Sequence, residues 1–379
     1  YLWTPQEVEA AVGKETAALL CHLLGGKGGG TCEGKSILHL AAEPQEVARG
    51  AAVDSAQWEK ALLEARRRLR EARSRRVPPE KDTKALTALN GLALGTLAEA
   101  AAVLGRDDYR ETAQACASFL LERLRSEGRL LRSYRDGGAR LRGYLEDYAF
   151  MAEGLLALYE ATFTRRWLDE ARSLAEGMVD LFWEEGEGAF YDTGRDHEPL
   201  PVRPRDVFDN ATPCGSSAAA GVLLRLALLT GEEGYRQKAA RLLRSVAPLL
   251  ARFPAGTGHW LCVLDFYLSA AKEVAIVGRP GEEATQALLR PLFRPFIPNK
   301  VVAGCDPEDG EAARGIPLLE GKAPIGGRPT AFVCQNYACQ EPATRPEDLA
   351  RQLGVPLAPR EGAPGDTWFI LHLPSRDRG

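Results

Sequence analysis

Three copies of one short pattern divide the middle of the chain into units of two helices each. In each copy a turn is followed by an aromatic residue with an alanine four residues later, and the aromatic residues are Tyr109, Trp167 and Tyr235. They are separated by 58 and then 68 residues. Because an apolar helix precedes each pattern and an amphipathic helix follows it, the repeat predicts stacked helical hairpins.

The two helices of each predicted hairpin differ in how their apolar residues are distributed. The first helix is apolar almost all round, over residues 86–104, 148–159 and 218–229. The second carries Arg, Glu and Gln on one face, over residues 110–125, 166–181 and 236–249. A helix that is apolar on all sides is buried, whereas a helix with one polar face lies at the surface. We therefore expect an inner layer and an outer layer of helices, with a further helix over 259–271 starting a fourth unit.

The pattern changes after residue 272. Short β-branched runs over 274–278, 300–303 and 331–335 alternate there with helical segments over 282–292 and 345–353, as in a small α/β segment. We therefore predict a mainly α chain with three parts. These parts are a partial (α/α)6 toroid of helical hairpins over 1–272, a small α/β segment over 273–353, and a tail over 354–379.

Charge and hydropathy limit the partners of the chain. The net charge is −4 and the pI about 5.9, which argues against a nucleic-acid binder with a basic surface. No apolar run in the sequence reaches the roughly 18 residues that a membrane span requires, so we expect no membrane partner. The chain begins at Tyr1 rather than Met, and we expect it to be the C-terminal part of a longer protein.

The eight cysteines show neither a C-x-x-C pair nor a zinc-binding spacing. We therefore predict reduced thiols, including Cys334 and Cys339, no metal ion or cofactor, and a cytoplasmic location.

Residues 29–36 match the P-loop pattern G-x-x-x-x-G-K-[ST]. A working P-loop joins a strand to a helix, whereas here a helix precedes the match and a short extended run follows it, so we interpret the match as chance.

Long loops over 127–143 and 184–214 lead into the predicted inner helices, and both place carboxylates there. Glu146 and Asp147 open one inner helix, while Asp206 and Asp209 precede the next. Glycoside hydrolysis needs two carboxylates about 5–10 Å apart, so these four residues are the catalytic candidates. The alternative is that Glu146 and Asp147 stabilise their helix through its dipole.

Five polar or aromatic residues near these carboxylates are candidates for substrate binding: Asn90, Tyr144, Arg203, Arg205 and Asn210. A tyrosine can stack on a sugar ring and arginine forks can hold an anionic group. Each residue also has a structural interpretation: a buried hydrogen bond between helices for Asn90, core packing for Tyr144, and a loop held by its own ion pairs for the polar cluster of Arg203, Arg205 and Asn210.

Several motifs occur in an order that resembles one known family: residues 81–92 (KDTKALTALNGL), 144–150 (YLEDYAF), 203–206, 209–217 and 334–339. They are similar to the motifs of the YyaL-like, spermatogenesis-associated, thioredoxin-domain-containing proteins. The resemblance runs from Tyr1 to about Leu353. Leu89 stands where the family has Trp, and Pro213-Cys214-Gly215-Ser216-Ser217 stands where the family has Pro-Ser-x-Asn-Ser.

The resemblance implies a thioredoxin-like domain followed by a six-hairpin toroid like that of glycosidases and sugar epimerases. It implies that this chain lacks the thioredoxin-like domain and the first hairpins, so that its missing N-terminal half or a homodimer partner would cover the open flank. Three functional hypotheses remain open at this point. They are a carbohydrate-binding or carbohydrate-active toroid with a small sugar as ligand, a redox accessory platform, and a non-catalytic interaction scaffold.

Overall fold

The computed structural model describes residues 1–25, 34–335 and 338–356. The described residues form two compact units, one up to Thr83 and the other from Lys84 onward. The first boundary therefore falls inside the range 1–272 that the sequence suggested as one domain. Most of the P-loop match and residues 357–379 of the predicted tail lie outside the described residues.

The first unit is a small helical bundle with its own core. Its helices are α1 (Pro5–Val12), α2 (Lys14–Leu23), α3 (Pro44–Gly50) and α4 (Ser55–Ser74). Thr4 and Glu7 form a reciprocal capping box at the start of α1, with N–O distances of 2.8 and 3.2 Å. The helices enclose Leu20, Leu23 and Trp58, which are almost fully buried.

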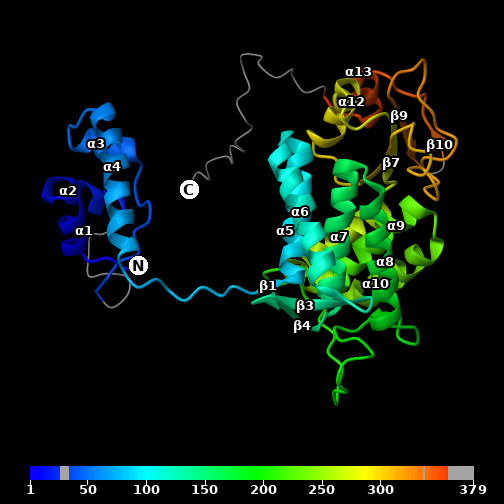
Figure 1. The fold of residues 1–379 in the computed structure, drawn as a ribbon, viewed down its shortest axis with the longest axis horizontal. Helices are drawn as coiled ribbons and strands as arrows, with labels where there is room; N and C mark the ends of the chain where they lie inside the picture. Colours follow the sequence, from blue (N-terminus) through cyan, green and yellow to red (C-terminus); the bar gives the residue numbers. More distant parts are fainter. Residues whose placement is uncertain (26–33, 336–337, 357–379) are drawn as a thin grey trace. The chain divides into compact units, whose positions relative to one another are not determined.

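The second unit contains the predicted hairpins, and their existence is confirmed (Figure 1). The hairpins are α5 (Thr87–Leu104) with α6 (Asp107–Arg123), α7 (Leu145–Thr162) with α8 (Arg165–Phe182), and α9 (Gly215–Thr230) with α10 (Glu233–Arg252). Helices α5, α7, α9 and α11 (Gly258–Leu268) pack side by side in this order, and α6, α8 and α10 pack outside them. The fold is therefore mainly α and forms part of an α/α toroid.

The predicted turns close these hairpins with left-handed backbone. Gly105, Phe163 and Gly231 end the three inner helices with φ values of 65°, 55° and 72°. Glycine adopts this conformation without steric strain, which explains two of the three positions. Phe163 fits because its side chain is held in the core of the α/β segment.

Helices α5 and α7 approach each other closely because both carry glycine at their crossing. A Cβ on Gly154 would lie 2.5 Å from the carbonyl oxygen of Gly91, and a Cβ on Gly91 would lie 2.7 Å from the backbone nitrogen of Met151. Only glycine fits at these two positions without moving a backbone. The close contact sets the spacing of the inner layer.

The loops that lead from outer to inner helices carry short strands. The first loop contains β2 (Arg125–Ser126), β3 (Arg129–Arg135) and β4 (Gly138–Arg142), and β3 also pairs with β1 (Ala85–Leu86). The second loop contains β5 (Trp183–Glu184) and β6 (Ala189–Phe190). These strands hold the long loops in place at one end of the inner helices.

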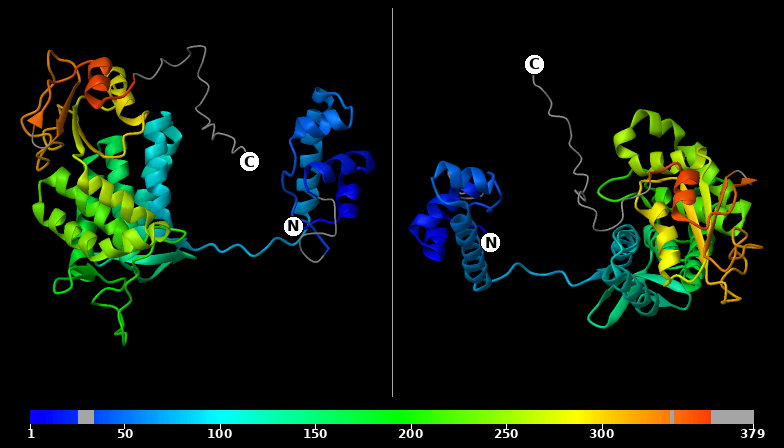
Figure 2. Two further views of the ribbon diagram at one scale, coloured as in Figure 1. Left: turned by 180° about the vertical axis from the view of Figure 1, so that it is seen from behind. Right: turned by 90° about the horizontal axis from the view of Figure 1, so that it is seen from above.

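The α/β segment follows α11 and packs on the same unit (Figure 2). It contains β7 (Lys272–Val277), α12 (Glu283–Phe293), β8 (Lys300–Cys305), β9 (Thr330–Gln335), β10 (Ala338–Cys339) and α13 (Pro346–Leu353). The strand order is β10–β9–β7–β8, with β7 parallel to β8 and antiparallel to β9. The expected alternation of strands and helices is confirmed.

The prediction that Cys334 and Cys339 are reduced was wrong, because the structure joins them in a disulfide. The two residues lie directly opposite each other on β9 and β10. The four residues between them excluded a thioredoxin-type motif but did not exclude a hairpin, which brings the two sulfur atoms together.

Within the described residues of the second unit, helix α5 forms one end of the inner layer, and only one of its sides packs on another inner helix. Leu89 is 52% exposed there, and Val103 and Leu104 are each 39% exposed. Among the described residues, α5 is also the one helix long and apolar enough by composition to cross a membrane, and 33% of that window is buried in the protein.

Candidate functional site

The N-termini of all four inner helices meet at the end of the fold that carries the long loops. Two aspartates tie them together in pairs. Asp147 joins the starts of α5 and α7, and Asp209 joins the starts of α9 and α11. Exposed N–H groups and the helix dipole make such an end favourable for polar and anionic ligands.

Asp147 is fully buried beneath this end. Its Oδ1 accepts from the Ala88 backbone N–H at 2.9 Å, and its Oδ2 accepts from the Tyr144 N–H at 2.9 Å. Arg132 donates to the same Oδ2 at 3.1 Å. Burial nevertheless raises the pKa of Asp147 to about 6, against the lowering effect of these donors. The structure thus places this candidate in a helix-capping position.

Asp209 has a similar position one hairpin further on. Its Oδ1 accepts from the Cys214 N–H and the Ser217 hydroxyl, both at 2.9 Å. Its Oδ2 accepts from the backbone N–H groups of His259 and Trp260 at 2.8 and 3.3 Å. The carboxylate therefore satisfies donors that the starts of α9 and α11 would otherwise leave unpaired.

A cavity of about 340 Å³ lies between the starts of α7 and α9. It combines three carboxylates, an arginine, an amide and two aromatic rings: Glu146, Asp192, Asp206, Arg132, Asn210, Tyr144 and Phe208. The structure therefore brings together four of the predicted residues, Tyr144, Glu146, Asp206 and Asn210. Arg132 and Asp192 join them.

Arg132 organises one wall of this cavity. It extends from β3, and its Nη1 lies 2.9 Å from Glu146 Oε1. Its guanidinium also lies 4.6 Å from the centre of the Tyr144 ring. Tyr144 is packed edge-on against His197, with 5.2 Å between ring centres. These contacts hold both the aromatic wall and the Glu146 carboxylate in place.

Asp192 and Asp206 line the same cavity and contact each other. The Asp206 backbone N–H donates to Asp192 Oδ2 at 2.8 Å, and Asp192 Oδ1 has no hydrogen-bond partner among the described residues. Partial burial raises the pKa of Asp192 to about 6, and the negative charges of Asp206 and Glu146 add to this effect. The pocket thus holds a carboxyl group that exchanges its proton near neutral pH.

The remaining predicted residues lie outside this cavity. Asn90 donates to the Leu86 carbonyl at 2.8 Å within its own helix. Arg203 covers the Tyr191 ring at 4.3 Å and donates to the Thr193 carbonyl. Arg205 reaches Ser245 on α10 at 3.3 Å. These three side chains hold loops and helices in place in this structure.

Ser217, His259 and Asp209 resemble a catalytic triad only in their composition. The Ser217 hydroxyl lies 3.0 Å from His259 Nδ1 and 2.9 Å from Asp209 Oδ1. Ser217 is completely buried, so no substrate reaches its oxygen. Within the described ranges, no group of three His, Cys, Asp or Glu side chains is arranged to hold a metal ion.

Sequence reasoning missed Arg132 and Asp192. Both belong to the extended stretches of the two long loops, which marked these loops as ordered. Nothing in their spacing distinguishes them from Arg129 or Asp196, which pair with each other at 2.8 Å instead. Only the folding of both loops over the same helix ends selects them.

Curated proteins of known sequence share much of this chain. Human spermatogenesis-associated protein 20 is 34% identical over 298 residues, which are 76% of this chain and 38% of the human protein. The rat protein of the same name is 33% identical over 301 residues, again 76% of this chain and 38% of that protein. Over the matched residues, the chain belongs to the spermatogenesis-associated protein 20 family.

The chain spans less than half the length of the family members it matches. An uncharacterized protein of Caenorhabditis elegans is 28% identical over 328 residues, which are 84% of this chain and 44% of that protein. No protein-family model matches the chain.

Solved structures similar to this family member include enzymes that act on sugars. Cellobiose 2-epimerase from Spirochaeta thermophila is 21% identical with a TM-score of 0.36, covering 46% of this chain and 45% of that one. A GH76 alpha-mannanase from Bacteroides thetaiotaomicron is 17% identical with a TM-score of 0.35, covering 63% of this chain and 72% of that one. TM-scores of this size carry no conclusion about the activity of the chain.

Proposed function

We propose that the cavity between the starts of α7 and α9 binds a small carbohydrate and that its carboxylates act on it by acid–base chemistry. The observation that carries this proposal is the position of Asp192. It is a half-buried carboxyl group with a pKa of about 6 that lines the same cavity as Asp206 and Glu146. Pairs of carboxyl groups in different environments are the usual arrangement for acid–base chemistry on sugars.

The size and lining of the cavity suit a sugar ring. About 340 Å³ accommodates one or two sugar units, and the walls offer both acceptors and donors for hydroxyl groups. Tyr144 and Phe208 supply apolar faces on which the C–H side of a sugar ring can pack. The adjoining helix N-termini favour polar ligands as well.

The carboxyl groups of the cavity have different roles in the proposed chemistry. Asp192 is protonated over part of the neutral range, so it is the group that donates a proton to a leaving or ring oxygen. Glu146, held by Arg132, is the partner carboxylate in the same cavity. Asp206 fixes Asp192 through its backbone N–H and raises its proton affinity through its charge.

A thermal-shift screen tests this proposal. The chain is heated with mono- and disaccharides, sugar phosphates and uronic acids, beside the variants Asp192→Asn and Asp206→Asn. Asp136→Asn is the matched control, because Asp136 is an exposed carboxylate in the β3–β4 turn, outside the cavity. We expect a saturable shift in the wild type and in the control that is lost in both pocket variants. A shift that survives in both pocket variants, or none in a folded sample, would contradict the proposal.

A further inference from the structure

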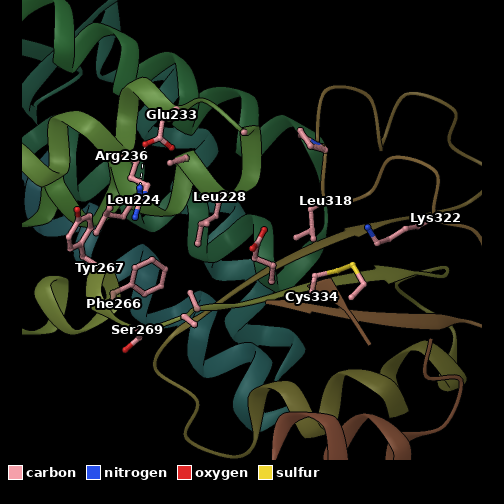
Figure 3. Close-up of a pocket in the computed structure, with 17 residues that line it drawn as sticks. Leu224, Leu228, Glu233, Arg236, Phe266, Tyr267, Ser269, Leu318, Lys322 and Cys334 are labelled. Carbon is pink, nitrogen blue, oxygen red and sulfur yellow. Dashed lines mark hydrogen bonds and ion pairs between the residues drawn. A yellow bond between two sulfur atoms is a disulfide. The ribbon is translucent and has the colours of Figure 1, made fainter. Parts of the chain in front are cut away.

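A second, larger cavity of about 470 Å³ lies where α9, α10 and α11 meet the α/β sheet (Figure 3). Its apolar lining comes mainly from Leu224, Leu228, Phe266 and Leu318. Its charged lining comprises two cations and two acids, namely Arg236, Lys322, Glu233 and Glu273. Mixed charge of this kind matches a small zwitterionic ligand better than a neutral or purely anionic one.

The Cys334–Cys339 disulfide forms part of the wall of this cavity. Cys334 is 5% exposed, whereas Cys339 is exposed, so the two sulfur atoms differ in their access to solvent. Figure 3 shows Lys322 and Cys334 on the same side of the cavity. An incoming thiol would therefore meet Cys339 first and find a cation nearby.

The sheet itself holds the two cysteines together without the disulfide. Gln340 N–H donates to the Val333 carbonyl at 2.9 Å beside the pair, and Ala331 and Ala343 exchange two hydrogen bonds of 2.8 Å further along. The disulfide closes a loop of very few residues, so it lowers the entropy of the unfolded chain only a little and adds little to stability. The pair can therefore open and close while the strands stay in place.

Glu273 lies directly beside the buried cysteine. On β7 it is the residue opposite Cys334, so both side chains point to the same face of the sheet, and both line the cavity. Burial raises the pKa of Glu273, while the charge of Lys322 acts in the opposite direction. A carboxyl group in this position can give a proton to a thiolate that forms on Cys334.

We propose that Cys334–Cys339 is a redox-active disulfide that exchanges with a small zwitterionic thiol bound in this cavity. The thiol loses its proton to solvent, and its sulfur attacks Cys339 Sγ. The S–S bond breaks, and Cys334 leaves as a thiolate that takes a proton from Glu273. A second thiol then loses its proton to solvent and attacks the ligand sulfur of the mixed disulfide, which releases Cys339 as a thiolate. Solvent protonates Cys339 and returns a proton to Glu273. Two thiols are oxidised to one disulfide, and the cysteine pair is reduced to two thiols.

This site is separate from the proposed sugar pocket, and neither proposal depends on the other. The experiment uses the whole chain with reduced and oxidised glutathione as probes, because glutathione is a zwitterionic thiol. Cys262 is exposed and is not in a disulfide, so glutathione can also react with it. Mass-spectrometric peptide mapping therefore measures the state of each cysteine separately. Far-UV circular dichroism follows the fold of each sample.

We expect reduced glutathione to open the pair in the native protein without loss of secondary structure. In Cys334→Ser, oxidised glutathione should trap a mixed disulfide on Cys339, whereas Cys339→Ser should leave the buried Cys334 unmodified. Glu273→Gln should slow reduction about tenfold and change its pH profile, while the exposed control Glu311→Gln should not.

Three results would overturn the proposal. One is a pair that stays oxidised until denaturant is added. Another is a pair that remains a dithiol in excess oxidised glutathione. The third is a Glu273→Gln rate and pH profile equal to those of Glu311→Gln.

Discussion

Asp147 Oδ1 accepts a 2.9 Å hydrogen bond from the backbone N–H of Ala88, a residue 59 positions earlier in the chain. The contact joins the starts of two inner helices, α5 and α7. The other oxygen of the same carboxylate caps α7 itself through the Tyr144 N–H. A residue that sequence reasoning offered as a catalytic acid therefore holds two neighbouring hairpins in register, and its neighbour Glu146 faces the cavity instead.

Replacing Asp147 by alanine should destabilise the second unit. The change leaves two buried backbone N–H groups without an acceptor, and each loss of this kind costs about 1–2 kcal/mol. We expect a fall of about 3 kcal/mol in the free energy of unfolding. Urea denaturation followed by circular dichroism measures it. Glu146→Ala is the control, and equal losses in both variants would contradict the capping role.

The pH dependence of stability should show the same carboxyl group. The pKa of Asp147 is about 6 in the folded protein and 3.8 in its ordinary state, so the folded state binds the proton more tightly. The stabilisation that comes from protonating this carboxyl group is therefore fully present below about pH 4, is lost as pH rises from about 4 to 6, and stays lost above that. The change is at most about 3 kcal/mol.

Urea denaturation of wild type and Asp147→Asn between pH 4 and 7 checks this sign. The variant cannot titrate at this position, so the free energy of unfolding of the wild type minus that of the variant should fall as pH rises. If this signed difference stays constant or rises with pH, the carboxyl group does not have a raised pKa.

The crossing of α5 and α7 makes a prediction about two glycines on one helix. Alanine at Gly91 would place its Cβ 2.7 Å from the backbone nitrogen of Met151, so one helix must move. Alanine at Gly95 would meet the Cα of Gly154 at 3.4 Å, an ordinary contact.

We therefore expect Gly91→Ala to lower the free energy of unfolding by about 1–3 kcal/mol through overpacking. Gly95→Ala should leave it unchanged or raise it by up to about 1 kcal/mol through helix propensity. Thermal and urea unfolding of both variants measure the two effects. If both variants lose equal stability, the crossing is not as close as described here.

The exposed side of α5 should mediate self-association. Leu89, Val103 and Leu104 lie exposed on this helix, where the inner layer ends. We expect the chain to form dimers that the double variant Leu89→Lys, Val103→Lys disrupts. Leu63→Lys is the control, because Leu63 is an exposed leucine of the first unit. Light scattering after size-exclusion chromatography gives the mass, and a monomer at all concentrations would contradict this expectation.

The hairpins could be predicted because their signals are local. The turns around Gly105 and Gly231 repeat, and the apolar helices before them differ from the amphipathic helices after them along every turn. The sites could not be predicted to the same depth, because they depend on contacts between distant segments. Asp192 enters the pocket only because β6 and the loop after it fold over the start of α7.

The Cys334–Cys339 disulfide could not be predicted from the sequence for the same reason. Cys334 and Cys339 become partners because β10 turns back along β9, and a two-residue strand such as β10 gives almost no signal in the sequence.

Asp147 and Asp209 were recognised as important acids. Their function in capping helices α5 and α11 could not be recognised, because Ala88 and His259 each lie about 50 or more residues away along the chain.

A crystal structure of the chain with the sugar that gives the largest thermal shift tests the central claim most directly. The account predicts the sugar ring in the cavity lined by Tyr144, Asp192 and Asp206, with Asp192 within hydrogen-bonding distance of a sugar oxygen. A sugar bound only elsewhere, for example in the cavity lined by Phe266 and Lys322, would contradict the account.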